Sequence, residues 1–307
     1  IFRSDDDGKT WHYLTDLYPC FWGRMFIHNG EVYMLACSTE YGDLLIGKSS
    51  DGGKTFGTPT VLLRGSCKCD VAGVHKNPQP PLIYKGRLYT TLEWGSWGEG
   101  YHAAMVGSAP ADADLLSAAN WAFTDPVPYN PEWKGVAKGD SYGNIEGTLT
   151  VLPDGNLYNV MRYDMTRCEP NFGLVLAYRV NSGEPEAPLT YSHAIRLPGN
   201  HSKFMIRKDE KTGFYYTVID RITDPALPRD RRLLSLMRSP DAEQWETVSD
   251  LMDFRGEDPE KTGFQYVDFF MEGETLYFLC RTAMNDPINF HDSNYSTFHK
   301  VENFRSL

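Results

Sequence analysis

The sequence has no long apolar run and no cluster of basic residues. Its 307 residues include 30 Lys and Arg against 41 Asp and Glu, which gives a formal net charge of -11. An acidic chain without a basic run is poorly suited to bind nucleic acid or an anionic membrane surface. No stretch approaches the roughly 20 apolar residues that a membrane-spanning helix needs. We therefore expect neither a nucleic-acid partner nor a membrane span.

Cysteine is scarce, and the sequence patterns that bind metals are missing. Cys67 and Cys69 flank one lysine, a spacing that disfavours a mutual disulfide and fits no common zinc pattern. None of the eight histidines shows the i, i+4 spacing that places two ligands on one helix face. We expect no metal and no cofactor. The chain begins at Ile1 without a methionine or a signal-like segment, so we expect it to be processed or truncated.

Aromatic residues, in contrast, make up 13% of the chain, a content that suits sheet packing and stacking on sugar rings. One short pattern also occurs twice: residues 4–11 and 49–56 both read S-x-D-x-G-x-T followed by an aromatic residue. Ser and Asp side chains bind nearby backbone groups and the glycine takes a positive φ, so the pattern predicts a β-hairpin turn. It resembles the Asp-box of sialidase-like β-propellers. We expect its acidic residues to stabilise the turn rather than to act in catalysis.

Five further hairpin turns recur along the chain, each between two short apolar runs. Their glycines are separated in turn by 56, 69, 58 and 60 residues, and they are Gly30, Gly86, Gly155, Gly213 and Gly273. Strand, tight turn and strand at a nearly constant period are typical of a propeller blade.

A second strand pair follows each of these turns, so each repeat predicts four antiparallel strands. Residues 1–14 hold one more turn and two strands, with nothing before them. We therefore predict an all-β, six-bladed β-propeller of four-stranded antiparallel blades, the first of which lacks its inner strands. It forms one domain over 1–307, with units at about 1–19, 20–66, 67–138, 139–196, 197–256 and 257–307. The alternative is a five-bladed ring that the N-terminal strands close.

Three segments resemble sialidase motifs. Residues 144–162, NIEGTLTVLPDGNLYNVMR, are similar to N-E-S-x-x-V-x-L-x-D-G-x-L-x-x-N-x-R, which implies that Glu146 polarises a tyrosine nucleophile and that Arg162 binds the substrate carboxylate. Residues 231–239, RRLLSLMRS, look like R-x-x-L-T-V-R-L-S and imply the same binding role for Arg231. Tyr266 lies where the family has its nucleophile, in Y-S-x-L.

The chemistry that this resemblance implies is consistent. A neutral tyrosine activated by a glutamate avoids repulsion from the carboxylate of an acidic sugar, and the planar fork of arginine donates two parallel hydrogen bonds to a carboxylate. The first-blade arginine and aspartic general acid of the family have no counterpart in this chain. Each residue also has an alternative role without catalysis or substrate binding: a solvated loop for Glu146, a surface ion pair for Arg231 and strand packing for Tyr266.

Two histidines outside these motifs precede predicted inner strands. His75 lies in HKNPQ, and His201 lies in NHSK together with Lys203. We expect substrate contact or proton transfer at these positions, and the alternative is a polar cap on a strand end. Either histidine together with Glu146 would support acid–base catalysis without a tyrosine nucleophile.

Two other segments are candidates for substrate binding. Glu93, Trp94 and Trp97 alternate with glycines, which predicts a flexible aromatic loop that stacks a sugar ring. His291 and Asp292 precede the last predicted strand, where they orient one another or form a turn.

These expectations lead to one main functional hypothesis. It is an exo-acting, sialidase-like glycoside hydrolase on an acidic sugar, retaining through Tyr266 and Glu146 and, by the resemblance, secreted or periplasmic. A second hypothesis is a polysaccharide lyase or uronate-directed hydrolase that uses histidine or tyrosine. A third is a non-catalytic propeller that binds glycans. The partner is a carbohydrate in every case, and the sequence predicts no oligomeric state.

Overall fold

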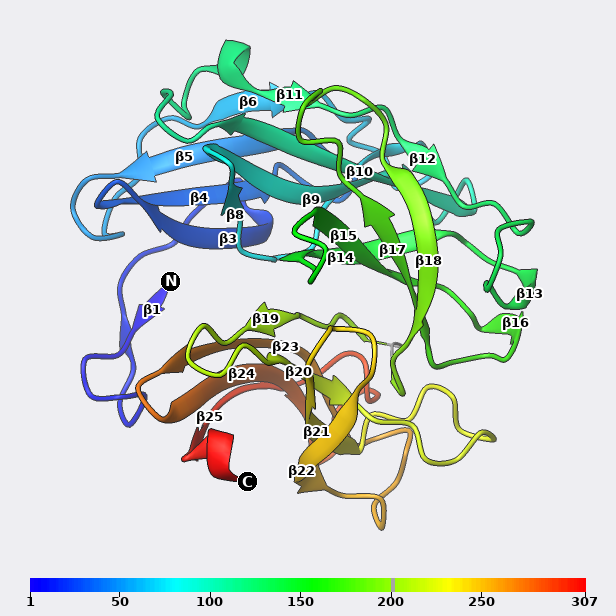
Figure 1. Cartoon of the computed structure of the whole chain (residues 1–307). Helices are drawn as coiled ribbons and strands as arrows, with labels where there is room; N and C mark the ends of the chain where they lie inside the picture. Colours follow the sequence, from blue (N-terminus) through cyan, green and yellow to red (C-terminus); the bar gives the residue numbers. More distant parts are fainter. Residues whose placement is uncertain (200–201) are drawn as a thin grey trace. The chain divides into compact units, whose positions relative to one another are not determined.

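The computed structural model describes residues 1–199 and 202–307, which form two compact units (Figure 1). Unit 1 contains Ile1–Tyr129, Tyr142–Leu149 and Arg179–Thr190, and unit 2 contains Asn130–Ser141, Thr150–Tyr178 and Tyr191–Leu307. The regular elements are β-strands and two short 3-10 helices. Within the described residues, no helix has the length and apolar character to cross a membrane.

Unit 1 contains two large antiparallel sheets. The first has the order β3-β4-β5-β6, with strands Phe21–His28, Glu31–Cys37, Leu44–Ser49 and Thr60–Leu63. In the second, β9 pairs with β10 on one side and with both β7 and β8 on the other, so its inner strand is split by residues 76–81. The strands of this sheet are β7 Gly73–His75, β8 Leu82–Tyr84, β9 Arg87–Ser96, β10 Tyr101–Pro110, β11 Ala122–Phe123 and β12 Val127–Pro128, and helix η1 is Ala118–Asn120.

The third sheet takes its residues from both units, and the last two lie in unit 2. The third has the order β14-β15-β17-β18, with strands Asn144–Val151, Leu157–Tyr163, Leu174–Arg179 and Thr190–Arg196. The fourth has the order β19-β20-β21-β22, with strands Arg207–Lys208, Tyr215–Asp220, Leu233–Ser239 and Glu246–Asp253. The fifth has the order β23-β24-β25, with strands Gly263–Glu272, Thr275–Ala283 and Tyr295–Glu302, before helix η2 at Phe304–Ser306. A separate ribbon pairs β13 (Lys138–Asp140) with β16 (Arg167–Glu169).

The chain is therefore an all-β propeller-type fold with five blades, and the prediction of six is wrong. The N-terminal residues form only the isolated hairpin β1 (Phe2–Arg3) and β2 (His12–Tyr13). The blade count was overestimated because the turn between β1 and β2 is stabilised by hydrogen bonds of its own side chains. It can therefore form outside a blade. The five predicted hairpin glycines all take positive φ, between 56° and 80°.

The repeated turn shows the hydrogen bonds that its sequence predicts. The Ser49 hydroxyl donates to Asp51 Oδ1 at 2.8 Å and accepts the Gly53 N–H at 2.9 Å. The other carboxylate oxygen of Asp51 accepts the Thr55 hydroxyl at 2.6 Å, and this bond lowers the pKa of Asp51 well below its ordinary value. Both oxygens of the Asp51 carboxylate accept hydrogen bonds within the turn, so the residue has a structural role there.

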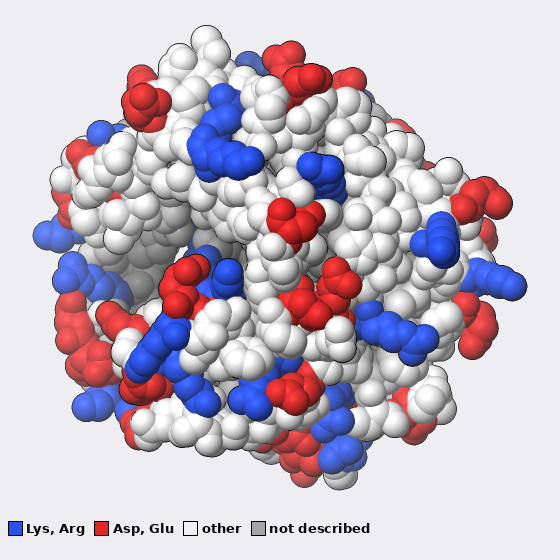
Figure 2. Space-filling model, in the orientation of Figure 1, with Lys and Arg blue, Asp and Glu red and all other residues white. Residues whose placement is uncertain are grey.

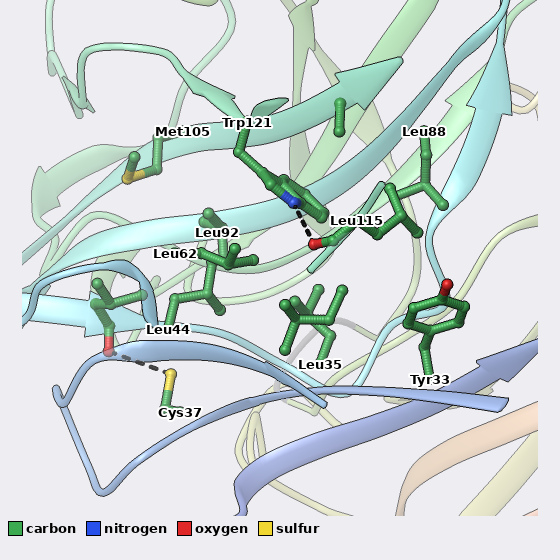
Figure 3. Close-up of a cluster of buried hydrophobic side chains, with 13 residues drawn as sticks. Tyr33, Leu35, Cys37, Leu44, Leu62, Leu88, Leu92, Met105, Leu115 and Trp121 are labelled. Atoms are coloured by element: carbon green, nitrogen blue, oxygen red, sulfur yellow. Dashed lines mark hydrogen bonds between the residues drawn. The ribbon is translucent and has the colours of Figure 1, made fainter. Parts of the chain in front are cut away.

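The core of unit 1 lies between its two large sheets (Figure 3). Tyr33, Leu35 and Cys37 alternate along β4 and point to the same side, as a period of two requires. Trp121 closes the cluster, and its indole N–H donates to the Leu115 carbonyl at 3.0 Å. In unit 2, two further clusters pack the faces of β15, β17, β20, β21, β23 and β24.

Replacing Leu35 by alanine should lower the free energy of unfolding by about 2–5 kcal/mol, because a fully buried side chain leaves a cavity. Ile27, on the neighbouring strand β3, is 76% exposed, and Ile27→Ala should change stability by less than about 0.5 kcal/mol. Urea unfolding of both variants measures the difference. Equal losses would contradict this assignment of the core.

Charged side chains of both signs are interspersed on the face drawn in Figure 2. Independently of that view, charged side chains of unit 2 form local ion pairs, such as Arg221 with Asp250 at 2.8 Å and Arg238 with Glu246 at 2.6 Å. Such exposed pairs contribute little to stability.

Candidate active site

Three residues in the first strands of their sheets take a left-handed backbone conformation that is costly for a residue other than glycine. They are Trp22 on β3, Glu146 on β14 and Tyr266 on β23, with φ of 51°, 59° and 57°. The strand register shifts around Trp22 and around Tyr266, which marks a β-bulge at each. A bulge redirects a side chain, and strain of about 1–3 kcal/mol is characteristic of functional sites. The side chains around these positions are therefore candidates for a functional site.

In unit 1 a buried histidine–carboxylate pair lies close to the Trp22 bulge. His75 and Glu93 are direct partners across β7 and β9, and His75 Nδ1 lies 2.5 Å from Glu93 Oε2. The two residues are only 3% and 0% exposed. The other carboxylate oxygen, Oε1, accepts the Gly147 N–H at 3.2 Å. Both oxygens of Glu93 are therefore held by donors.

This pairing fixes the orientation of the His75 ring. Because Glu93 accepts the proton on Nδ1, the neutral ring carries its unprotonated nitrogen at Nε2. No described residue forms a hydrogen bond to Nε2. His75 Nε2 is thus a proton acceptor when the ring is neutral and a proton donor when it is charged.

Aromatic rings surround His75. The Trp22 ring centroid lies 4.1 Å from that of His75, and His102 lies 5.3 Å away. The Tyr41 hydroxyl accepts the Trp97 backbone N–H at 3.0 Å and lies 3.1 Å from His102 Nε2. Burial raises the pKa of Tyr41 above its ordinary value, so its hydroxyl keeps its proton.

The residues after His75 connect it to the segment of Glu146. Lys76 is fully buried, its Nζ donates to the Asn77 carbonyl at 2.9 Å, and burial lowers the pKa of Lys76 to about 8. The Asn77 amide donates to the Gly147 carbonyl at 2.9 Å. Gly147 therefore binds both Glu93 and Asn77, and the buried Glu146 immediately precedes it.

The structure corrects the predicted aromatic loop. Glu93 and Trp94 lie on strand β9, and Trp94 is partly buried against the core cluster of unit 1. Trp97 follows the strand end, is 43% exposed and contacts His102 at a centroid distance of 4.6 Å. Gly95 is required for close packing, because a Cβ there would collide with the Tyr101 carbonyl. Gly95 therefore marks close packing of β9 against β10 rather than a flexible loop.

In unit 2 the structure brings Arg231, Tyr266 and His291 together. The Arg231 guanidinium lies 5.7 Å from the Tyr266 ring centroid, and the Tyr266 hydroxyl lies 3.4 Å from His291 Nε2. Asp292 Oδ1 lies 3.1 Å from His291 Nδ1, which agrees with the predicted mutual orientation. Sequence reasoning missed Arg281, whose guanidinium lies 5.0 Å from the same Tyr266 ring.

A buried acid supports the Tyr266 bulge. The Tyr266 N–H donates to the Ser202 hydroxyl at 3.0 Å, and that hydroxyl donates to Asp220. Burial raises the pKa of Asp220 to about 8, although the charge of Arg231 opposes the shift. At neutral pH Asp220 is therefore mostly protonated, and it acts as a neutral hydrogen-bonding group under the strained backbone.

The remaining predicted residues are more dispersed. Lys203 is buried and its Nζ donates to the Val267 carbonyl at 3.1 Å, which places it behind the β23 bulge. Arg162 is half-buried on β15 in unit 2. His201 lies outside the described residues. In the described part of the chain, no group of three or more His, Cys, Asp or Glu side chains is placed to bind a metal ion.

The raised pKa of Asp220 predicts a pH dependence of stability. Between about pH 4 and about pH 8 the folded chain keeps a proton that the unfolded chain releases, so stability should fall with rising pH by up to about 1.4 kcal/mol per unit. Asp220→Asn should remove this slope, and the exposed control Asp253→Asn should retain it. Urea unfolding at several pH values in this window measures the slopes. An unchanged slope in Asp220→Asn would contradict the assignment.

Comparisons with known proteins identify similar folds. No family model matches the chain. The Penicillium chrysogenum α-L-arabinanase bound to arabinobiose is similar with a TM-score of 0.60 and 14% identity, over 100% of this chain and 85% of that one. An ulvan lyase, from a polysaccharide lyase family, is similar with a TM-score of 0.55 and 11% identity, over 95% and 67%.

One curated protein also matches part of the sequence. An extracellular exo-α-(1→5)-L-arabinofuranosidase of Streptomyces avermitilis is 29% identical over 113 residues, which are 36% of this chain and 22% of that protein. The matched segment therefore spans about a fifth of the relative's length. The coarser part of the predicted resemblance is confirmed, whereas a specific relation to sialidases stays a prediction. The chain has a propeller-type fold similar to that of an α-L-arabinanase.

Proposed function

We propose that this protein is a glycoside hydrolase in which His75, oriented by Glu93, carries the proton needed for cleavage. The observation that supports this proposal is the buried pair in unit 1, with Nδ1 bound to a carboxylate and Nε2 without a partner among the described residues. A histidine held in this way is suited to general acid–base catalysis. The likeness of the fold to carbohydrate-active enzymes supports a glycan as substrate.

The proposed chemistry follows from the two states of His75. In the charged state Nε2–H donates its proton to the leaving glycosidic oxygen, while the Glu93 carboxylate stabilises the positive ring through Nδ1–H. The neutral ring then takes a proton from the attacking water, which restores the starting state. A positioned group of this kind contributes about 10²- to 10⁴-fold to the rate.

Aromatic side chains next to His75 favour a sugar as the ligand. Trp97 is partly exposed beside His102, and the Trp22 ring packs on His75. The apolar faces of sugar rings stack on such side chains, and a polar edge remains free for hydrogen bonds. Trp22 and Trp97 would then orient the sugar while His75 acts on the bond.

The mechanism through Tyr266 and Glu146 stays a prediction. Glu146 belongs to unit 1 and Tyr266 to unit 2, and the Tyr266 hydroxyl lies against His291 Nε2. The sialidase-like type, the retaining outcome and the exo action likewise stay predictions. The proton transfer proposed for His75 rests on the His75–Glu93 pair and does not involve Tyr266.

A polysaccharide lyase is the second candidate, because the neutral Nε2 of His75 is also suited to abstract a carbon-bound proton. In such an elimination His75 takes the proton next to a uronate carboxyl group. The resulting electron pair forms the carbon–carbon double bond, and the glycosidic oxygen leaves with its bonding pair. The similarity in fold to an ulvan lyase supports this alternative.

Product analysis separates the candidates. The protein is incubated with arabinans, galactans and uronate-containing polysaccharides, and new reducing ends and unsaturated uronates are measured. Reducing ends without unsaturation would support the hydrolase, and unsaturated products would identify a lyase. Glycan binding without turnover across the whole panel would contradict both enzymes and support a binding protein.

A further inference from the structure

The Tyr266 side chain in unit 2 lies against several cationic groups. The Cζ atoms of Arg281 and Arg231 lie 5.0 and 5.7 Å from the centroid of its ring. Arg231 also lies 5.3 Å from the ring centroid of Phe290. His291 lies at the Tyr266 hydroxyl, and burial lowers the pKa of His291 below its ordinary value, so the neutral ring is favoured there. Positive charge and aromatic surface are therefore concentrated at one place.

Arg238, elsewhere in unit 2, provides a contrast with Arg281. Its guanidinium stacks over Phe214 at 5.4 Å and is also bonded to the Glu246 carboxylate at 2.6 Å. Arg281 donates from Nη2 to the backbone carbonyl of His291 at 2.6 Å, and no described carboxylate forms an ion pair with it. Arg281 therefore lies against an aromatic ring, that of Tyr266, but has no paired carboxylate of the kind that Glu246 provides for Arg238.

The acidic side chains near Arg281 are either bonded to other residues or buried. Asp230 forms two hydrogen bonds of 2.9 Å with Arg232, and Asp292 lies against His291 Nδ1. Asp220 is buried behind the bulge, and burial raises its pKa to about 8, so it is mostly neutral at pH 7. The local charge is thus positive on a chain whose formal net charge is -11.

We propose that Arg281, Tyr266 and His291 form a binding site for an oxyanion that is attached to a sugar, either a carboxylate or a sulfate ester. The Arg281 guanidinium pairs with the oxyanion, the Tyr266 hydroxyl and His291 supply further polar contacts, and Phe290 offers an apolar face to the ring. The proposal rests on the proposed function in taking a glycan as the ligand, and it deepens that function by making the glycan acidic.

The backbone around Tyr266 keeps this site in place before a ligand arrives. The strained φ of 57° is maintained by the hydrogen bond from the Tyr266 N–H to Ser202, and the Gln265 amide donates to the Phe290 and His291 carbonyls at 2.9 and 2.7 Å. The bulge and the loop that carries His291 are therefore tied together. A site that is ordered beforehand loses less entropy on binding.

Binding measurements without turnover test this proposal. Methyl glucuronide, glucose 6-sulfate and the neutral methyl glucoside are titrated separately into the full chain, and nuclear magnetic resonance follows the His291 signals. At least one anionic sugar should bind at least about tenfold more tightly than the neutral one. The two anionic sugars show whether the site takes a carboxylate, a sulfate or both.

Two arginine variants complete the test. Arg281→Gln should weaken binding of the anionic sugar about tenfold or more, whereas Arg238→Gln, the stacked and paired control, should leave it unchanged. Equal binding of neutral and anionic sugars, or equal affinity in Arg281→Gln and the wild type, would overturn the proposal. Because no cleavage is measured, these outcomes are independent of whether the protein proves to be a hydrolase.

Discussion

Replacing His75 by alanine should lower kcat by about 10²- to 10⁴-fold on any glycan that the wild-type protein cleaves. The imidazole is the proposed proton carrier, and no other described group bonds its Nε2 position. Steady-state kinetics on the substrate found by product analysis measure the loss. His299, a half-buried histidine on β25 that bonds Thr297, is the matched control, and His299→Ala should leave kcat within about twofold.

Loss of His75 also leaves the buried Glu93 without its partner, so His75→Ala could lose activity by unfolding. His75→Gln controls for this, because the amide can still donate to Glu93 while it cannot carry a proton at neutral pH. His75→Gln should therefore unfold at nearly the wild-type urea concentration and still show the loss in kcat. Full activity in a folded His75→Gln protein would refute the catalytic role.

Replacing Glu93 by glutamine should lower both activity and stability. The two carboxylate oxygens accept from His75 Nδ1–H and from the Gly147 N–H, whereas an amide offers one oxygen and one NH₂ group. One buried donor is then left without an acceptor, at a cost of about 1–3 kcal/mol. The ring of His75 also loses its fixed tautomer, so kcat should fall about 10²-fold or more while KM changes little.

Kinetics and urea unfolding of Glu93→Gln measure these two effects. Glu99 is a suitable control, because among the described residues its exposed carboxylate accepts only the Ala72 N–H, and an amide oxygen can replace it. Glu99→Gln should change stability by less than about 0.5 kcal/mol and leave kcat unchanged. The assignment fails if Glu93→Gln and Glu99→Gln behave alike.

The sequence was most informative where a structural feature is local. Each hairpin glycine sits at a position that needs positive φ, so the turns could be predicted individually and their spacing indicated blades. The same locality explains the wrong blade count. The turn at Ser4–Trp11 closes through its own Ser4 and Asp6 hydrogen bonds, and it forms in a hairpin that belongs to no blade.

The candidate site depends on long-range register, which the sequence alone does not fix. His75 meets Glu93 because a split inner strand pairs with β9 in one particular alignment, and nothing near either residue specifies it. Tyr41 and His102 are 61 positions apart, and no local sequence pattern links the two residues. Arg281 was missed for a similar reason, because it lies in the middle of a strand, β24.

The inner-strand argument was more successful for unit 2. It selected Arg231, Tyr266 and His291 because each precedes or begins a strand, and the structure places the three side chains together. Whether they bind substrate stays a prediction. The grouping of Tyr266 with His291 could be anticipated, because β23 and β25 both pair antiparallel with β24 and therefore begin at the same edge of their sheet.

Chemical rescue of His75→Ala by free imidazole tests the central claim most directly. If a proton is exchanged at Nε2 of His75, imidazole that enters the vacated space should restore part of kcat in a concentration-dependent manner and yield the wild-type product. Glu93→Gln should show no such rescue, since it retains its own imidazole. A folded His75→Ala protein that is inactive at every imidazole concentration, or fully active without any, would contradict the account.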